Sequence, residues 1–210
     1  MNDISKQIAS SLLQIKAVKI NVQKHFVWAS GWNSPIYCDN RKILSYPAIR
    51  KLIYTAFSEK INEKYGDCEF IAGVATGAIA HGALVADALN KPFVYVRSSP
   101  KSHGMENLIE GELTENSKVV VIEDLVSTGG SSIAAVEAIK KAGCQVLGML
   151  AIFSYEFEAA AKNFAAANCD LTTLCNYTEL LDEATKCGYI NADDIKTVGE
   201  WRQSPETWKK

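Results

Sequence analysis

Apolar residues along this chain fall into two patterns, short continuous runs and longer stretches with helical spacing. A run that is apolar at every position indicates a strand buried on both faces, and spacing at i, i+3 and i+4 indicates an amphipathic helix. The predicted strands are EFIAGVA (69–75), PFVYVR (92–97), KVVVIEDL (118–125), QVLGMLAIF (145–153) and DLTTLC (170–175). The predicted helices between them span residues 79–89, 131–142 and 156–167. Strands that alternate with helices predict an α/β fold with a mainly parallel central sheet flanked by helices.

The chain outside this alternation consists of an N-terminal part and a long loop. Helical spacing covers residues 3–17 and 46–65, with a turn-rich stretch between them. Residues 97–118 show proline, glycine, histidine and charge without a steady period. A loop of about twenty residues inside a compact domain is usually functional or disordered. The sequence contains no repeat, low-complexity segment or interdomain linker, so it predicts one domain over residues 1–210.

Composition excludes several classes of protein. The 210 residues are 48% hydrophobic and 22% charged, with a net charge of −2, and the sequence has no basic block of the kind that follows a nucleic-acid backbone. The N-terminus lacks the apolar core of a signal peptide, and no run reaches the roughly 18 apolar residues of a membrane span. The six cysteines form no CxxC pair and suit neither a zinc site nor a disulfide framework. We therefore expect a cytoplasmic protein with reduced thiols that binds neither nucleic acid nor membrane.

The strongest chemical signal is the segment VVVIEDLVSTGGSS at residues 119–132. The pattern predicts a buried strand over residues 119–122, then Glu123 and Asp124, then a Ser-Thr-Gly-Gly turn that opens a helix at Ser131. Glycines permit a positive φ and the close approach of a ligand to the backbone. Backbone N–H groups at a helix N-terminus bind anions, and the hydroxyl groups of the turn add further donors. The turn therefore predicts a phosphate cradle.

The two acids make this prediction more specific. Glu123 and Asp124 stand beside the cradle, where they would repel a bare phosphate. They make chemical sense if they hold the two hydroxyls of a ribose, or Mg²⁺ that bridges those hydroxyls and a pyrophosphate. The structural alternative is a strand-to-helix turn with acids as helix caps, but capping does not require both acids and the Ser-Thr-Gly-Gly turn. A P-loop is excluded because no Gly-Lys-Ser/Thr triplet is present.

Residues 119–131 resemble the phosphoribosyl pyrophosphate motif of the type I phosphoribosyltransferases. This resemblance implies that family's fold, with a small N-terminal hood over about residues 1–45, a mobile catalytic loop and the use of Mg²⁺. It implies Glu123 and Asp124 as metal ligands, direct or indirect. It assigns the phosphoribosyl pyrophosphate site to Arg97, Lys101, His103, Glu123, Asp124, Leu125, Val126, Ser127, Thr128, Gly129, Gly130 and Ser131.

Two further segments resemble one branch of that family, the orotate phosphoribosyltransferases. The segment SGWNSPIYCDNRK (30–42) is similar to the SG-x-x-SP motif that leads into the base site. The segment YVRSSPKSHGMENLIEG (95–111) is similar to the catalytic loop, with its R-x-x-x-K-x-H-G pattern. Together with the cradle, the resemblance spans residues 30–153. It implies transfer of the 5-phosphoribosyl group from phosphoribosyl pyrophosphate to orotate, by a homodimer in which Arg97 and Lys101 reach the neighbouring subunit's site.

The loop also has a chemical logic of its own. Departure of pyrophosphate builds positive charge on the sugar and negative charge on the leaving group, which the cations Arg97, Lys101 and His103 would stabilise. A lid also excludes water that would hydrolyse the intermediate. The structural alternative is a solvated surface loop with scattered charge. The predicted catalytic residues are Lys101, His103 and Asp124.

Several positions depart from the family's pattern. Ser98 replaces a second loop lysine, Thr76-Gly77 replaces a Tyr-Lys pair, Ala29 replaces another lysine, and Tyr155 replaces the arginine that holds the orotate carboxylate. Arginine grips carboxylates through two parallel hydrogen bonds. Arg41 is therefore our candidate for holding the orotate carboxylate, against the alternative of a surface arginine. The remaining base-site candidates, by resemblance, are Ser127, Tyr37 and Cys38.

Two other functions stay open at this point. A purine phosphoribosyltransferase would share the cradle but lack the motifs at residues 30–42 and 101–104. A regulatory protein that senses the donor without chemistry usually carries a DNA-binding appendage, for which this chain has neither a basic face nor room. His25 and His81 have no ligand-spaced partner, so we interpret both as structural.

Overall fold

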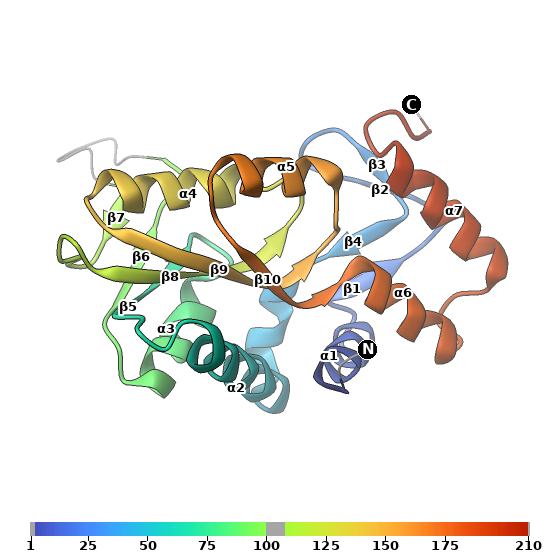
Figure 1. Cartoon of the computed structure of the whole chain (residues 1–210). Helices are drawn as coiled ribbons and strands as arrows, with labels where there is room; N and C mark the ends of the chain where they lie inside the picture. The colour runs from blue at the N-terminus through green and yellow to red at the C-terminus, as the bar shows by residue number, and fades with distance from the viewer. Residues whose placement is uncertain (1–2, 100–107, 210) are drawn as a thin grey trace.

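The computed structural model describes residues 3–99 and 108–209, and its centre is a six-stranded sheet (Figure 1). The strands are β5 (Phe70–Val74), β6 (Phe93–Val96), β7 (Ile109–Glu110), β8 (Lys118–Val126), β9 (Gln145–Ser154) and β10 (Leu171–Asn176), in the order β10-β9-β8-β5-β6-β7. All neighbouring strands are parallel except β6 and β7, which are antiparallel. The predicted α/β fold with a mainly parallel sheet is confirmed.

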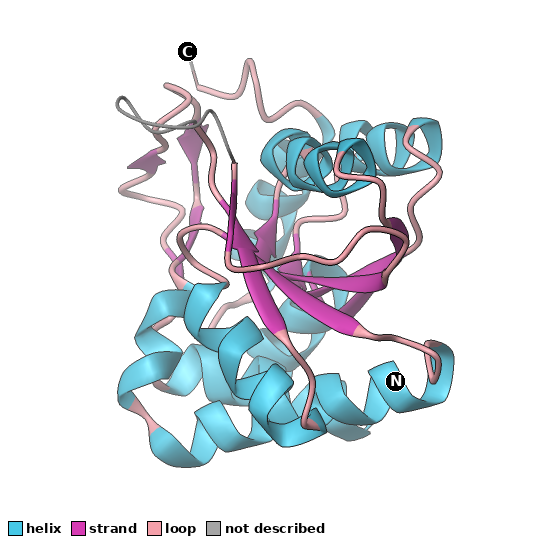
Figure 2. Ribbon diagram, turned by 90° about the vertical axis from the view of Figure 1, so that its left-hand side faces the viewer, coloured by secondary structure: helices cyan, strands magenta, loops and turns pink. Residues whose placement is uncertain are grey.

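Helices cover both faces of this sheet, as two views at right angles show (Figures 1 and 2). On one face lie α4 (Gly130–Lys141) and α5 (Glu158–Ala166), and on the other α1 (Asp3–Gln14), α2 (Pro47–Lys64) and α3 (Ile79–Leu89). Alternate side chains of β8 enter different cores. Val119 and Val121 pack in the cluster that includes α4, whereas Val120 and Ile122 pack in the cluster that includes α2 and α3. Burial on both faces requires apolar side chains at every position, which is why a continuous run identified this strand.

The boundaries around the acids differ by one residue from the predicted run of 118–125 and the predicted helix start. β8 ends at Val126, and α4 begins at Gly130 instead of Ser131. Gly129 lies at the N-cap of α4 with a φ of +83°, a left-handed conformation that favours glycine. Its carbonyl accepts the N–H of Ile133 at 2.9 Å, which is the first hydrogen bond of the helix. The turn that joins strand to helix is therefore shorter than the sequence suggested.

Two other boundaries also moved. The first helix ends at Gln14, before residue 17, and Lys16 after it has a φ of +55°, outside the helical range. The short strand β7 lies inside the stretch that was predicted as a loop, where Tyr95 and Val96 pair with Glu110 and Ile109. Among the helices of the described chain, none is both long and apolar enough to cross a membrane.

Beyond α1, the predicted hood (about residues 1–45) consists of two small antiparallel strand pairs and a 3₁₀ helix. The pairs are β1 (Val18–Ile20) with β4 (Ile36–Cys38) and β2 (Phe26–Val27) with β3 (Asn33–Ser34), and the helix is η1 (Asn40–Ser45). The chain ends with α6 (Tyr177–Lys186) and α7 (Ala192–Gln203). The C-terminal tail lies beside β2 and β3, whereas the N-terminus lies at α1, below them in Figure 1.

An aromatic cluster holds the hood against α7. Trp201 of α7 is fully buried, and its indole N–H donates to the carbonyl of Asn33 at 3.0 Å. The ring of Trp28 lies 4.9 Å from that of Tyr155 and 5.6 Å from that of Trp201, centroid to centroid. Aromatic side chains bury large apolar areas and gain further from such edge and tilted contacts. The C-terminal helix therefore stabilises the position of the hood over the sheet.

Candidate active site

A cavity of about 380 Å³ opens at the carboxyl ends of β5 and β8. Its walls come from three segments that are far apart in the sequence: the hood after β4, the turn after β5, and the end of β8 with the first turn of α4. The lining residues are Cys38, Asp39, Arg41, Val74, Ala75, Thr76, Gly77, Glu123, Asp124, Leu125 and Ser131. Ligands of parallel α/β sheets bind at this end of the strands. The structure therefore brings the two acids and part of the cradle together with the base-site candidates Cys38 and Arg41.

A larger hollow of about 750 Å³ lies elsewhere, between α6 and α7. Tyr177, Leu181, Ile195 and Arg202 are among its lining residues, and neither the acid pair nor the cradle contributes to it. The chemistry of the lining, more than the volume, therefore identifies the candidate site.

Glu123 is buried beneath the cavity, and both of its carboxylate oxygens are engaged. One accepts the hydroxyl of Ser132 and the other accepts the backbone N–H of Asp124, each at 2.9 Å. Burial, together with the charge of Asp124, raises the pKa of Glu123. Glu123 thus connects the end of β8 to the first turn of α4, a role that the sequence did not indicate.

Asp124 borders the cavity beside Gly77. A Cβ atom added to Gly77 would overlap the Asp124 carboxylate, so the absence of a side chain there gives the acid its place. Burial raises the pKa of Asp124, and the charge of Arg41 partly opposes this effect. Gly77 stands where the family's pattern has lysine, and in this chain it makes room for the acid.

The Ser-Thr-Gly-Gly segment forms a turn that opens toward solvent. Gly130 and Ser131 are exposed, and a Cβ atom added to Gly130 would meet nothing within 4 Å. The first N–H groups of a helix have no intrahelical partner and favour an anion. Behind the turn, the Asn163 side chain of α5 donates to the carbonyl of Thr128 at 2.8 Å. The predicted cradle is thus open on its ligand side and supported on the other, by a residue that the sequence analysis missed.

The SG-x-x-SP segment, which leads through β4 into the opposite wall, forms two tight turns. Gly31 has a φ of +83°, and the Ser34 hydroxyl donates to the Ile36 carbonyl at 2.7 Å and accepts the Ile36 N–H at 3.1 Å. Beyond β4, Asp39 and Arg41 form an ion pair with a separation of 2.7 Å. The hydrogen bond from Arg41 lowers the pKa of Asp39. The Arg41 side chain is 60% exposed, so its guanidinium is accessible from the cavity.

The other predicted base-site and donor-site residues lie around this cavity in different environments. Tyr37 is exposed, whereas Cys38 is buried. Burial raises the pKa of the Cys38 thiol well above its usual value, which keeps it protonated. The side chain of Val126 packs in the core with α4, so only its backbone could contact phosphoribosyl pyrophosphate. Ser127, in the turn that follows, is partly buried.

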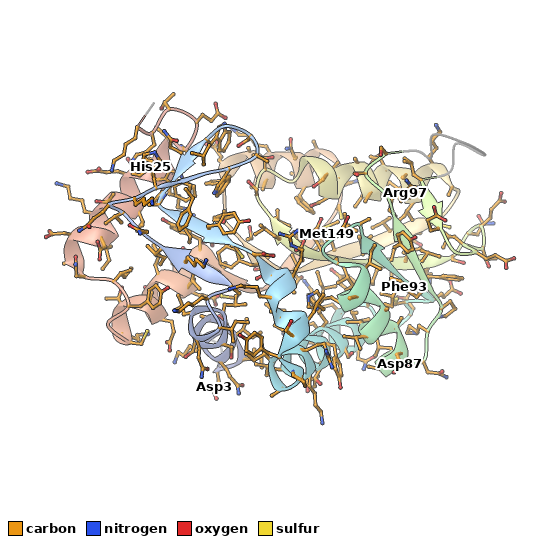
Figure 3. All side chains as sticks on the ribbon, turned by 180° about the vertical axis from the view of Figure 1, so that it is seen from behind. Asp3, His25, Asp87, Phe93, Arg97 and Met149 are labelled. Atoms are coloured by element: carbon orange, nitrogen blue, oxygen red, sulfur yellow. The ribbon has the colours of Figure 1, made fainter. Side chains whose placement is uncertain are left out.

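The loop residues are placed only in part. Arg97 lies just beyond β6, at the opposite end of the molecule from His25 of the hood (Figure 3). Its guanidinium forms an ion pair with Glu110 of β7 at 3.3 Å, a partner that the sequence did not suggest. Lys101 and His103 lie outside the described residues, so their predicted roles stay predictions.

Tyr155, where the family's pattern has arginine, belongs to the buried aromatic cluster beneath the hood. Its side chain is 1% exposed and stacks on Phe157, with ring centroids 5.5 Å apart and an interplanar angle of 10°. Trp28 and Trp201 complete the surroundings. A guanidinium at this position would be buried in an apolar cluster, at high cost in free energy. Position 155 therefore supports the hood, and a carboxylate-binding group must come from elsewhere.

An acid beside a phosphate cradle, at the carboxyl end of a parallel sheet, defines a class of α/β proteins that bind a phosphorylated ribose. Comparison with known proteins identifies the family. The family model described as the phosphoribosyl transferase domain matches residues 39–178.

Relatives narrow the assignment further. Over 208 residues the chain is 59% identical to the orotate phosphoribosyltransferase of Porphyromonas gingivalis, covering 99% of both chains. Over 209 residues it is 56% identical to that of Phocaeicola vulgatus, covering 100% of this chain and 99% of the relative. The crystal structure of orotate phosphoribosyltransferase from Aeropyrum pernix matches with a TM-score of 0.76 and 27% identity, over 88% of this chain and 99% of that one. The chain belongs to the phosphoribosyltransferase family and, within it, to the orotate phosphoribosyltransferases, as the motifs predicted.

The packing of Gly77 against Asp124 leads to a first prediction. We expect Gly77→Ala to displace the Asp124 carboxylate and to weaken binding of phosphoribosyl pyrophosphate. The loss should be about tenfold or more, because hydrogen bonds to charged groups contribute about 1.5–3 kcal/mol. Titration calorimetry measures it. Gly199→Ala is the matched control, since a Cβ there meets nothing within 4 Å and should raise stability by roughly 0.5–1 kcal/mol. Unchanged affinity in a folded Gly77→Ala variant would contradict the role given to Gly77.

The burial of Tyr155 leads to a second prediction. Tyr155→Arg should lower the free energy of unfolding by about 3 kcal/mol or more, because it leaves an unpaired charge inside the protein. It should not tighten binding of orotate. Tyr155→Phe keeps the ring and removes the hydroxyl together with its contact to the Cys38 backbone, so it should cost only about 1 kcal/mol. Urea unfolding measures both variants. A Tyr155→Arg variant as stable as the parent, with tighter orotate binding, would refute the assignment of this residue to the aromatic cluster.

Proposed function

We propose that this chain transfers the 5-phosphoribosyl group from phosphoribosyl pyrophosphate to orotate, giving orotidine 5′-monophosphate and pyrophosphate in pyrimidine biosynthesis. One observation carries the proposal: Asp124 and Ser131 of the donor side share a single cavity with Cys38 and Arg41 of the base side. The cavity thus offers one wall for a sugar phosphate and an adjoining wall for a planar acidic base. Two relatives named orotate phosphoribosyltransferase match nearly the whole chain at 59% and 56% identity.

In the proposed reaction the protein works mainly by positioning. The cradle (127–131) binds the 5′-phosphate through backbone N–H groups and hydroxyls, and Asp124 accepts hydrogen bonds from the ribose hydroxyls. Holding C1′ against the base nitrogen then contributes much of the rate. As the bond from C1′ to pyrophosphate breaks, the sugar becomes oxocarbenium-like. The cations Arg97, Lys101 and His103 stabilise the departing pyrophosphate.

The acid pair also fits Mg²⁺ as part of this proposal. Within the described ranges, no group of three or more His, Cys, Asp or Glu side chains could hold a metal. Mg²⁺ commonly binds through one or two carboxylates together with substrate phosphates and water, and an acid pair beside a phosphate cradle offers that donor set. Asp124 would face the ion, and Glu123, whose oxygens are engaged by Asp124 and Ser132, would act indirectly. When bound, the ion would neutralise pyrophosphate charge.

The proposal includes a homodimer and a cytoplasmic location. The resemblance of the loop to that of the orotate phosphoribosyltransferases implies that Arg97 and Lys101 reach into the neighbouring subunit. The position of Arg97 supports this arrangement, because it does not line the cavity of its own subunit. The cysteines are free thiols, which agrees with a reducing compartment.

The direct test is a panel of bases. Purified protein is supplied with Mg²⁺, phosphoribosyl pyrophosphate and one base at a time, namely orotate, uracil, adenine, hypoxanthine or xanthine, and pyrophosphate release is measured. We expect turnover with orotate alone. Turnover with a purine would keep the cradle but overturn the assignment of the base wall. Tight donor binding without turnover on any base would indicate a regulatory protein.

Arg41 provides the test of the base wall. It is the only lysine or arginine of the described chain that lines the cavity, so we propose that it binds the orotate carboxylate. Arg41→Ala should raise the KM for orotate by about 10- to 100-fold, because hydrogen bonds between charged groups contribute about 1.5–3 kcal/mol. The KM for phosphoribosyl pyrophosphate should stay near that of the parent. Lys42→Ala is the control, since the Lys42 ammonium contacts the Lys16 carbonyl at 3.2 Å and does not line the cavity. An orotate KM unchanged by Arg41→Ala would exclude Arg41.

A further inference from the structure

Asn40 is a buried polar residue between the two walls of the cavity. It begins η1, directly after β4 and Asp39, and is 1% exposed. Its amide N–H donates to the backbone carbonyl of Asp124 at 2.6 Å, across 84 positions of sequence. Its amide oxygen accepts the thiol of Cys38 at 3.3 Å. A single side chain thus connects the base wall to the donor wall.

The need for this contact follows from the shape of the sheet. The register of β5 with β8 ends at Gly73 opposite Ile122, whereas β8 continues to Val126. Side chains meet the backbone of Asp124 in this extension: the Glu123 carboxylate accepts its N–H at 2.9 Å, and Asn40 donates to its carbonyl. Buried backbone groups need hydrogen-bond partners. Asn40 therefore supplies what a longer β5 would otherwise provide.

The chemistry of the side chain suits this place closely. An amide can donate to the Asp124 carbonyl and accept from the Cys38 thiol at the same time. An aspartate would turn a carboxylate oxygen toward that carbonyl oxygen and be repelled by it. Its negative charge would also lie near those of Asp39 and Asp124. An apolar residue would fill the space and leave the carbonyl without its donor.

We infer that Asn40 is a positioning residue that fixes the spacing between the base wall and the donor wall. The inference rests on the proposed function and names a residue that acts through Asp124 and Cys38 without touching either substrate. The cradle and the Asp124 carboxylate hold the donor, and the Asn40 side chain contacts neither, because it binds only the backbone carbonyl of Asp124. Loss of Asn40 therefore leaves donor binding intact and slows the step that needs base and C1′ aligned.

The experiment compares Asn40→Ala and Asn40→Leu with the parent enzyme. Leucine keeps most of the volume, so it guards against a simple packing loss. We expect kcat with orotate to fall by about 10- to 100-fold, because a misplacement of about 1 Å can cost about 100-fold in rate. The dissociation constant for phosphoribosyl pyrophosphate with Mg²⁺, measured without base, should stay within about threefold of the parent. Thermal unfolding reports the folded fraction.

Tyr177→Phe is the matched control. Tyr177 is also buried and donates its hydroxyl to a backbone carbonyl, that of Val198 at 2.7 Å, but this contact joins α6 to α7 and lies outside both walls of the cavity. Its kcat and donor affinity should equal those of the parent.

Three outcomes would overturn the inference: parental kcat in folded Asn40 variants, a loss of donor affinity equal to the loss of kcat, or a loss of activity that only follows the unfolded fraction in both variants. The parent enzyme's own turnover with orotate tests the proposed function separately. A parent that turns orotate over beside unaffected Asn40 variants would sink this inference alone.

Discussion

The site depends on the stretch of β8 that continues beyond the end of β5. A strand that runs past its neighbour leaves backbone N–H and C=O groups that must find partners, and at Asp124 two side chains provide them. Glu123 accepts the N–H and Asn40 donates to the carbonyl. The other oxygen of Glu123 accepts the hydroxyl of Ser132 in the first turn of α4. One set of contacts therefore ties together the acid, the helix that carries the cradle, and the hood.

The same strand explains why two adjacent acids differ in function. Successive side chains of a strand point to opposite faces of the sheet. Val119 and Val121 face the core that includes α4, and Glu123 continues that series toward Ser132. Val120 and Ile122 face the other core, and Asp124 continues that series toward Gly77. Pleating alone thus gives one acid a structural task and leaves the other beside the cavity.

The hood is stabilised by residues that are distant from it in the sequence, and the same residues support the base wall. Trp201 of α7 and Tyr155 after β9 pack with Trp28 of the hood, so the base wall is supported by residues near the other end of the chain. A tyrosine at position 155 strengthens that contact but removes a cation from it. Arg41, held by Asp39 at 2.7 Å, brings a guanidinium to the cavity from the hood, whereas Tyr155 does not line the cavity. The carboxylate site that we propose thus lies on a different segment from the arginine of the family's pattern.

The sequence by itself determined the features that depend on neighbours along the chain. Burial on both faces makes a strand such as β8 apolar at every position, and a left-handed φ requires Gly129, so the parallel sheet and the cradle could be predicted. The motifs at residues 30–42 and 119–131 likewise identified the family. Only the tertiary structure decided the roles of Asn40, Glu123 and Tyr155. Their functions come from contacts with distant residues, as between Asn40 and Asp124, and no local pattern specifies which distant group will lie within hydrogen-bonding distance.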